Sequence, residues 1–194
     1  MTTKAVEIPG YVAGTWAIDP AHSEVSFVVR HLMISKVRGR FLAFEGRIVT
    51  GGDPLESSVT ATIDLASVDT GNKQRDDHVR SADFFEADVH PTMTYRSSGI
   101  RPDGDGFLLD GELTLKGVTR PVPLKLEVNG FGPDPFAADP FAGGRAGFTA
   151  TGEINRMDFG VSYNGPIPGG GVALSEKVQI VIEIQAVLQT DATA

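Results

Sequence analysis

The strongest constraint in this sequence is an alternation of apolar and polar residues that recurs along most of the chain. In residues 24–31, Val25, Phe27, Val29 and His31 share one face and alternate with a second set, which is polar except for one valine: Glu24, Ser26, Val28 and Arg30. Similar runs occupy residues 39–49, 57–65, 92–98, 106–115, 120–129, 146–156 and 177–188. A period of two residues is typical of β-strands with one buried face. Turn sequences separate most runs, among them GlyGlyAspPro at 51–54 and AspGlyAspGly at 103–106.

About eight such strands could build a sandwich or a closed barrel, since both place every second residue inside. Two features favour the barrel. The inward-facing sets contain the large rings of Phe27, Phe41, Tyr95 and Phe148. The last run is also long and apolar, and an unpaired edge of that kind would aggregate unless the sheet closed on itself. We therefore predict an all-β, antiparallel eight-stranded barrel with meander-like topology.

Two segments depart from the strand pattern. Residues 70–85 predict a short helix that Asn72 could cap, with Val79 as the only apolar residue of 73–80. Such a helix is either a solvated crossover or a lid over the barrel mouth. Residues 129–147 predict an irregular Pro- and Gly-rich loop, in which AspProPheAla at 134–137 is repeated at 139–142. Phe131, Phe136 and Phe141 would fold onto the barrel or mark a contact surface.

Composition excludes several classes of protein. The chain has 194 residues and a formal charge of −8, which repels phosphate backbones, so we expect no nucleic-acid partner. It has no cysteine, so disulfides and thiolate sites are impossible. No run of about 18 apolar residues occurs that could span a bilayer, so any membrane contact would be peripheral. The N-terminus lacks the apolar core of a secretory signal, and we expect a cytoplasmic protein.

Catalytic and metal-binding patterns are missing. We find no nucleophile elbow, HExxH motif, phosphate loop or dinucleotide fingerprint. His78 and His90 lie near several carboxylates, but their spacing matches no metal signature, and a solvated acidic loop is the simpler interpretation. Asp19, His22 and Ser23 lie within one strand entry and cannot form a relay. We therefore predict that the protein is not an enzyme and holds no metal.

Four segments, in this order and spacing, resemble the YceI-like family: HSEVSFVVRHLMISKVRGRF, SVTATIDLASVDTGNKQRDDHVRSADFFEADVHPTMTY, DGELTLKGVTRPVPL and INRMDFG. The resemblance implies an extended, lipocalin-like barrel over residues 15–188, flanked by an N-terminal extension (1–14) and a C-terminal tail (189–194). It also implies a helical segment, a homodimer in many members, and an interior tunnel that binds polyisoprenoids or similar long-chain amphiphiles. The expected ligand is such a lipid, with no other cofactor.

The alternation and the resemblance together predict the binding residues. The apolar tunnel is expected to be lined by Val25, Phe27, Val29, Phe41, Ile63, Phe84, Phe85, Met93, Tyr95, Leu113, Leu115, Leu124, Leu126 and Phe148. Head-group candidates at the mouth are Arg30, His31, Arg75, His78 and Arg80; His31 could equally be a structural histidine. The alternative is a structural or interaction domain whose barrel interior is simply a packed core.

Overall fold

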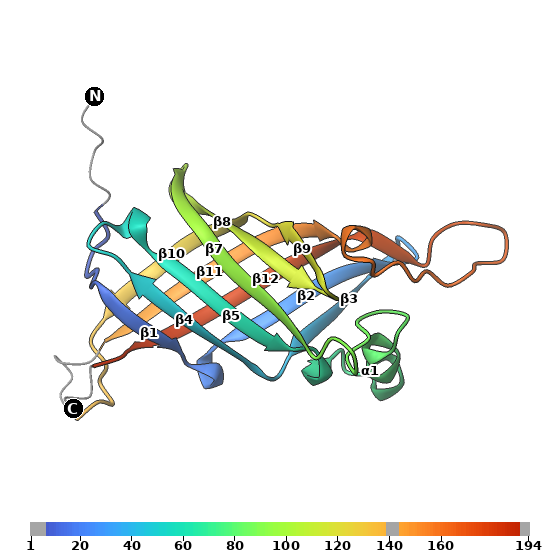
Figure 1. The fold of residues 1–194 in the computed structure, drawn as a ribbon, viewed down its shortest axis with the longest axis horizontal. Helices are drawn as coiled ribbons and strands as arrows, with labels where there is room; N and C mark the ends of the chain where they lie inside the picture. Colours follow the sequence, from blue (N-terminus) through green and yellow to red (C-terminus); the bar gives the residue numbers. More distant parts are fainter. Residues whose placement is uncertain (1–6, 139–143, 191–194) are drawn as a thin grey trace.

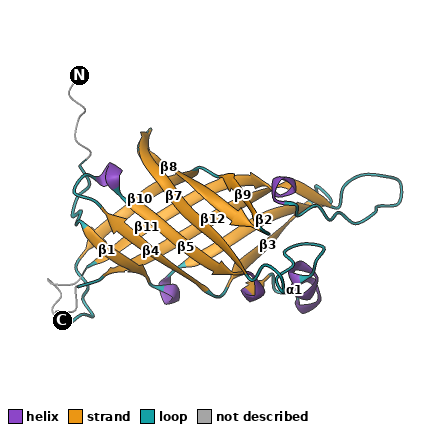
Figure 2. Ribbon diagram, viewed as in Figure 1, coloured by secondary structure: helices purple, strands orange, loops and turns teal. Residues whose placement is uncertain are grey.

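The computed structural model describes residues 7–138 and 144–190 and is an elongated antiparallel barrel (Figure 1). Its strands are β1 (Gly14–Ile18), β2 (Glu24–His31), β3 (Ser35–Phe41), β4 (Phe44–Thr50), β5 (Ser58–Asp64), β6 (Val68–Asp69), β7 (Thr92–Asp103), β8 (Gly106–Leu115), β9 (Val118–Pro121), β10 (Leu124–Gly132), β11 (Arg145–Asn155) and β12 (Leu174–Leu188). Its helices are α1 (Lys73–Arg80) and the 3-10 turns η1 (Pro20–His22), η2 (Pro54–Glu56), η3 (Leu65–Ser67) and η4 (Arg156–Phe159). Most of the molecule is β-strand (Figure 2).

The barrel closes through the first and last strands. The order β1-β4-β5-β7-β8-β10-β11-β12 returns to β1, because β12 pairs with β1 at Trp16↔Leu188. Strand β2 continues β1 and pairs with both β12 and β3, while β3 leads into β4. Every pairing is antiparallel, so the predicted eight-stranded antiparallel barrel is confirmed. Closure pairs the long apolar β12 on both sides, as its sequence required.

Several strand boundaries differ from the prediction. The run at 39–49 is two strands, because the amides of Leu42 and Ala43 bond to the carbonyl and hydroxyl of Ser67 instead of a neighbouring strand. The run at 120–129 is also divided, between β9 and β10, at Pro123, which has no N–H to donate to a ladder. Strand β1 was not predicted, since its five residues are too few to show a clear period.

The loop predicted at 129–147 is shorter than expected. Strand β10 continues to Gly132 and β11 begins at Arg145, so the ends of that range are paired strand. The ring of Phe131 packs inside, 5.5 Å from Trp16 and 5.8 Å from Phe148 between centroids. Phe136 is instead 86% exposed. The second AspProPheAla repeat, with Phe141, lies outside the described residues.

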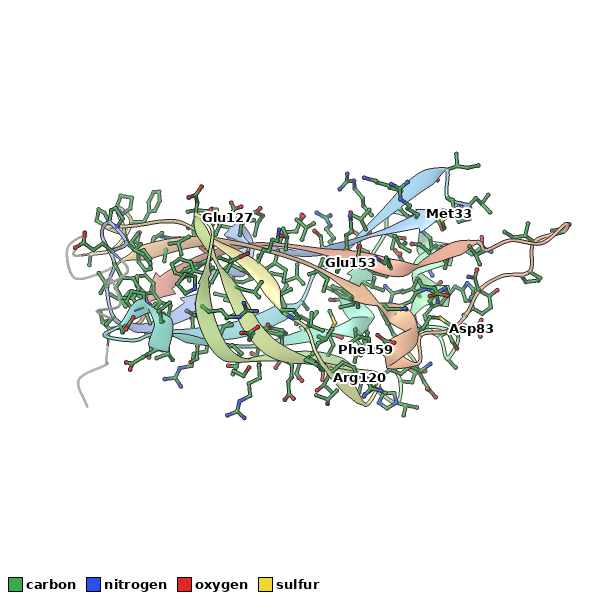
Figure 3. All side chains as sticks on the ribbon, turned by 90° about the horizontal axis from the view of Figure 1, so that it is seen from above. Met33, Asp83, Arg120, Glu127, Glu153 and Phe159 are labelled. Atoms are coloured by element: carbon green, nitrogen blue, oxygen red, sulfur yellow. The ribbon has the colours of Figure 1, made fainter. Side chains whose placement is uncertain are left out.

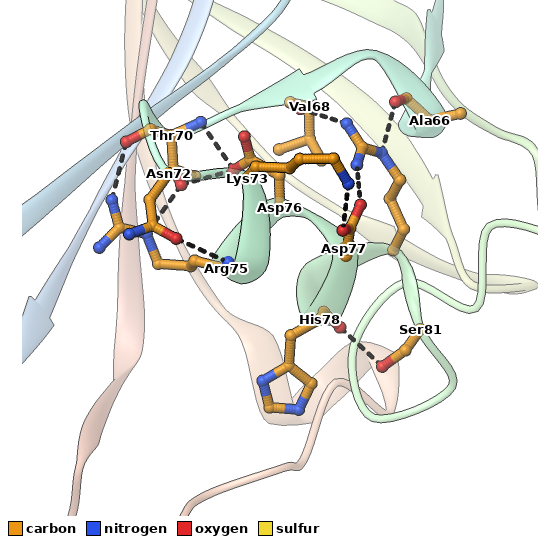
Figure 4. A network of polar contacts seen from close by, with 11 residues as sticks. Ala66, Val68, Thr70, Asn72, Lys73, Arg75, Asp76, Asp77, His78 and Ser81 are labelled. Carbon is orange, nitrogen blue, oxygen red and sulfur yellow. Dashed lines mark hydrogen bonds and ion pairs between the residues drawn. The ribbon is translucent and has the colours of Figure 1, made fainter.

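The helix is confirmed, but with narrower bounds than 70–85. Asn72 caps α1 by accepting a hydrogen bond from the Arg75 amide at 2.9 Å. The buried Asp76 accepts bonds from the amide and hydroxyl of Thr70 at 2.9 and 2.5 Å (Figure 4). These polar bonds fix a helix that has little apolar surface of its own. Among the described residues, no helix is long and apolar enough to cross a bilayer.

Candidate functional site: an apolar cavity along the barrel

A cavity of about 650 Å³ runs inside the barrel. All of the apolar tunnel residues predicted from the sequence line it. They share the inward face of their strands or, for Phe84 and Phe85, follow α1 at one end of the barrel. Further wall residues that the prediction did not name are Val59, Ala61, Ile100, Phe107, Leu109, Val178, Ile180, Ile182 and Ile184. The cavity wall is therefore almost entirely aliphatic and aromatic.

The shape of the wall depends on paired large and small residues across the strands. Phe27 of β2 faces Gly39 of β3, where the missing side chain makes room for the ring. The same ring lies 5.7 Å from that of Phe41, which in turn lies 6.0 Å from Phe85. A row of aromatic rings thus extends from the strands to the segment after α1.

Tyr95 adds a hydroxyl to this wall without making it polar. The group donates a hydrogen bond to the Val122 carbonyl at 3.0 Å and lies 3.4 Å from that of Leu109. Burial raises the pKa of Tyr95 well above its usual value, so the phenol stays neutral. The wall keeps its apolar character at this position because the one polar atom is already bonded to the backbone.

A second, smaller core lies at the end of the barrel away from α1 (Figure 1). Trp16, Ala146 and Ala186 are buried there, with Phe131, Phe148 and Leu188 packed around them. The indole N–H of Trp16 donates to the Thr50 hydroxyl at 2.8 Å. That hydroxyl donates in turn to the Val12 carbonyl at 2.7 Å. Because the Trp16 N–H and the Thr50 hydroxyl already have partners, neither is free to bind a polar group of a ligand.

The opposite end, beside α1, carries the basic side chains of the cavity lining. Of the head-group candidates, His31, Arg75 and His78 line the cavity, whereas Arg30 and Arg80 do not. Arg30 is exposed on the outer face of β2. Arg80 donates to the carbonyls of Ala66 at 2.7 Å and Val68 at 3.0 Å, holding α1 to the barrel (Figure 4). Sequence position alone could not separate these roles, because they depend on contacts between distant segments.

Two of these three side chains, Arg75 and His78, already have polar partners. Arg75 donates from Nε to the Thr70 hydroxyl and from Nη2 to the Thr70 carbonyl, each at 2.7 Å. His78 Nε2 lies 2.7 Å from Asp83. The imidazole also packs against Phe84 and Tyr163, with centroids 5.1 and 4.9 Å away. These rings form an aromatic cluster at the rim.

Arg156 was not predicted, although it lies within the INRMDFG segment. It lines the cavity, yet only 4% of the residue is exposed. Its Nε donates to the Ser175 carbonyl at 2.9 Å, and its Nη1 to those of Val161 at 2.6 Å and Tyr163 at 2.8 Å. Burial lowers the pKa of Arg156, opposed by the charge of Glu176. A charged residue beside an irregular turn is the only sequence signal that could have drawn attention to it.

The described residues contain no group of three or more histidine or acidic side chains placed to hold a metal ion. His90 lies against Gly117: a Cβ at that glycine would be 3.1 Å from the His90 ring. His78 contacts Asp83, as described above. The cavity is thus an apolar site with basic side chains at the end beside α1.

Comparison with known proteins agrees with this geometry. The family model for the YceI-like domain matches residues 16–186. The chain belongs to the YceI family. Protein YceI of Escherichia coli O17:K52:H18 is 37% identical to it over 182 residues, covering 92% of this chain and 89% of the relative.

Solved structures show the same barrel. BcnA of Burkholderia cenocepacia superposes with a TM-score of 0.71 at 27% identity, covering 87% of this YceI-family chain and 98% of BcnA. The Campylobacter jejuni YCEI protein gives 0.70 at 29% identity, covering 83% and 90%. A polyisoprenoid binding domain from Saccharophagus degradans gives 0.64 at 19% identity, covering 92% and 100%, which supports the fold alone.

Proposed function

We propose that this YceI-family protein binds a long-chain isoprenoid or a similar amphiphilic lipid in its barrel, for storage or transport and without catalysis. The observation that carries the proposal is the apolar cavity of about 650 Å³. Ligand sites typically measure about 300–1,000 Å³ and combine apolar walls with a few polar groups. A structural domain with a filled core, the alternative function, gives no reason for such a cavity. The description of the Saccharophagus degradans domain as polyisoprenoid binding supports the same ligand class.

The energetics suit a long chain. Each buried CH₂ contributes about 0.8 kcal/mol, so a five-carbon isoprenoid unit contributes roughly 3 kcal/mol relative to water. A lipid that leaves a membrane gains much less, because its tail is already in apolar surroundings. Selectivity among lipids must therefore come from the length that the cavity accepts and from the polar groups near α1.

Organic extraction and mass spectrometry of the purified protein test this function. We expect a long-chain lipid in an amount comparable to that of the protein. If extracts contain no lipid, and the delipidated protein does not bind geranylgeraniol or oleate, the proposal is wrong.

A pair of neighbouring residues on β5 allows a sharper test. Ala61 lines the cavity, whereas Thr60 beside it is exposed. Ala61→Phe should fill part of the cavity and reduce lipid content while the barrel stays folded. Thr60→Phe adds the same ring on the outer face and should leave lipid content unchanged. Equal lipid content in both variants would place the ligand elsewhere.

The cytoplasmic location and the homodimer expected from the sequence stay predictions. Fractionation of cells that produce the native protein, and sedimentation of the purified protein, test them separately from ligand binding.

A further inference from the structure

Arg156 is one of the residues that line the apolar cavity, and its guanidinium is incompletely hydrogen-bonded. Two of its nitrogens, Nε and Nη1, donate to backbone carbonyls, as described above. Nη2 is buried and has no hydrogen-bond partner among the described residues. Buried donors are normally satisfied, so such an exception suggests a missing partner.

The charge of Arg156 is compensated only at a distance, by the carboxylate of Glu176. None of the ion pairs formed within residues 7–138 and 144–190 includes it. Its acceptors are neutral carbonyls, and arginine cannot escape the cost of burial by losing its proton at ordinary pH. A buried cation is stable when an anion or several good acceptors accompany it. An anionic group bound inside the cavity would supply that partner.

Arg156 also lies at the right place for a head group. It begins η4 at the end of β11 and bonds to the start of β12, at the end of the barrel that carries α1 (Figure 1). Arg75 and His78 line the same cavity, but both are exposed and already bonded. Of these three side chains, Arg156 alone is fully removed from solvent.

We propose that Arg156 Nη2 binds the anionic oxygen of a lipid head group, a carboxylate or a phosphate, while the tail occupies the apolar cavity. This inference rests on the proposed function and specifies its ligand class: acidic amphiphiles in preference to neutral alcohols. A charge-assisted hydrogen bond in a water-poor site should favour the acid over its alcohol by about tenfold or more.

Matched ligand pairs test the inference. Dissociation constants of the delipidated protein are measured for oleate against oleyl alcohol, and for geranylgeranyl phosphate against geranylgeraniol. We expect both acids to bind about tenfold more tightly than their alcohols. Preference in only one pair identifies carboxylate or phosphate as the head group. If acids and alcohols bind equally, the inference is wrong although the proposed function stands, and if none binds, the proposed function fails.

Variants then assign the preference to a residue. Arg156→Gln should remove the preference for acids over alcohols while leaving alcohol binding unchanged. Arg156→Lys keeps the charge and should retain part of this preference. It also guards against a loss of folding in Arg156→Gln. Arg120→Gln, at an exposed arginine that does not line the cavity, is the matched control and should keep the preference. Retention of the preference in a folded Arg156→Gln protein, with its loss in Arg75→Gln or His78→Gln, would move the head group to the rim and overturn the inference.

A separate feature of the same end is the exposed apolar turn between β2 and β3. Leu32, Met33 and Ile34 are 42%, 46% and 84% exposed. Figure 3 shows Met33 at the tip of this hairpin. Leu32 and Met33 have φ values of 50° and 56°, a conformation that residues other than glycine, asparagine and aspartate rarely adopt. The Ile34 amide bonds to the His31 carbonyl at 3.0 Å, so this is a tight hairpin turn of the kind that requires positive φ at both central residues, and it holds these apolar side chains outward.

The strands below this turn carry unpaired positive charge. Arg30 lies directly opposite Lys36, and Arg38 follows two residues later on the same face. All three are exposed, and none takes part in an ion pair within the described residues. Like charges in opposite positions destabilise a sheet. In a protein of net charge −8, this local cluster complements an anionic surface.

We propose that the β2–β3 turn docks on an anionic lipid bilayer, with Leu32, Met33 and Ile34 entering the interface and the three cations contacting phosphate groups. The turn adjoins the cavity end near α1, since the Leu32 amide bonds to Ala173, a cavity residue. Docking there would place the α1 end of the cavity toward the source of the lipid.

Co-sedimentation with vesicles tests this second inference, with phosphatidylcholine alone and with added phosphatidylglycerol. We expect binding to the anionic vesicles that falls several-fold in Ile34→Ser and in Lys36→Glu. Phe136→Ser removes an equally exposed apolar residue elsewhere and should bind normally. The inference is overturned if the wild-type protein does not bind the anionic vesicles, or if Phe136→Ser loses as much vesicle binding as Ile34→Ser. It is also overturned if Ile34→Ser changes only self-association.

Discussion

The ring of Phe27 covers Gly39 on the facing strand so closely that a Cβ on residue 39 would lie 2.6 Å from its Cε1 atom. This contact fixes the direction in which the ring points and therefore the width of the cavity at that level. The inside of the barrel is thus shaped by a glycine as well as by its large residues.

Gly39→Ala should therefore displace Phe27 into the cavity. Overpacking of this kind typically costs about 1–3 kcal/mol. We expect a lower melting temperature together with less extractable lipid. Gly52→Ala is the control, since a Cβ there meets no atom within 4 Å. Unchanged stability and lipid content in Gly39→Ala would show that the ring moves freely.

Tyr95→Phe should separate stability from binding. The variant keeps the ring in the wall but leaves the Val122 carbonyl without its donor, which costs about 1–2 kcal/mol. Urea denaturation should show this loss, and lipid content should not change. Tyr163→Phe, which removes a hydroxyl that forms no hydrogen bond within the described residues, should be nearly as stable as the wild type. A fully stable Tyr95→Phe protein would contradict the buried bond.

The acid stability of the protein should depend on Asp134. Its pKa lies below the usual 3.8, because the Phe136 amide donates to the carboxylate and Arg145 adds a further bond. A lowered pKa in the folded state stabilises the protein above the pKa of the unfolded chain, and this contribution is lost as pH falls through the folded value. Asp134→Asn should therefore melt at a lower temperature than the wild type at neutral pH. The difference should shrink below about pH 3.8; a constant difference would rule out the ionised carboxylate as its cause.

Asn164 should control the loop beside the cavity end. Its side chain accepts hydrogen bonds from the amides of Ala173 and Leu174 at 2.9 and 3.1 Å, and donates to the Leu174 carbonyl at 3.1 Å. Asn164→Ala removes these hydrogen bonds, so amide hydrogen exchange in residues 165–174 should become faster. Asn129→Ala loses two exposed hydrogen bonds with Thr149 and should leave exchange in residues 165–174 unchanged. Equal exchange in both variants would mean that other contacts hold the loop.

Residue alternation was enough to place most strands and to assign their inward faces. Alternation is a local property of extended backbone, so Val25, Phe27 and Val29 could be assigned to one face before any partner strand was known. The same reasoning found the capped helix at Asn72, and the family resemblance agreed with both. Once the barrel closes, every inward residue must line its interior.

The roles of the arginines follow from the folded structure and could not be assigned from the sequence. Arg80 binds carbonyls of the segment before it, Arg30 points outward, and the unpredicted Arg156 is buried with Nη2 unbonded. The sequence pattern alone is equally compatible with each of these three roles for an arginine. Which one lines the cavity depends on how the chain folds back after β11, because the carbonyls that Arg156 binds belong to Val161, Tyr163 and Ser175, which lie 5, 7 and 19 residues further along the chain. Closure by β1 against β12 was likewise a long-range pairing, because strand alternation is the same in a sandwich and in a barrel.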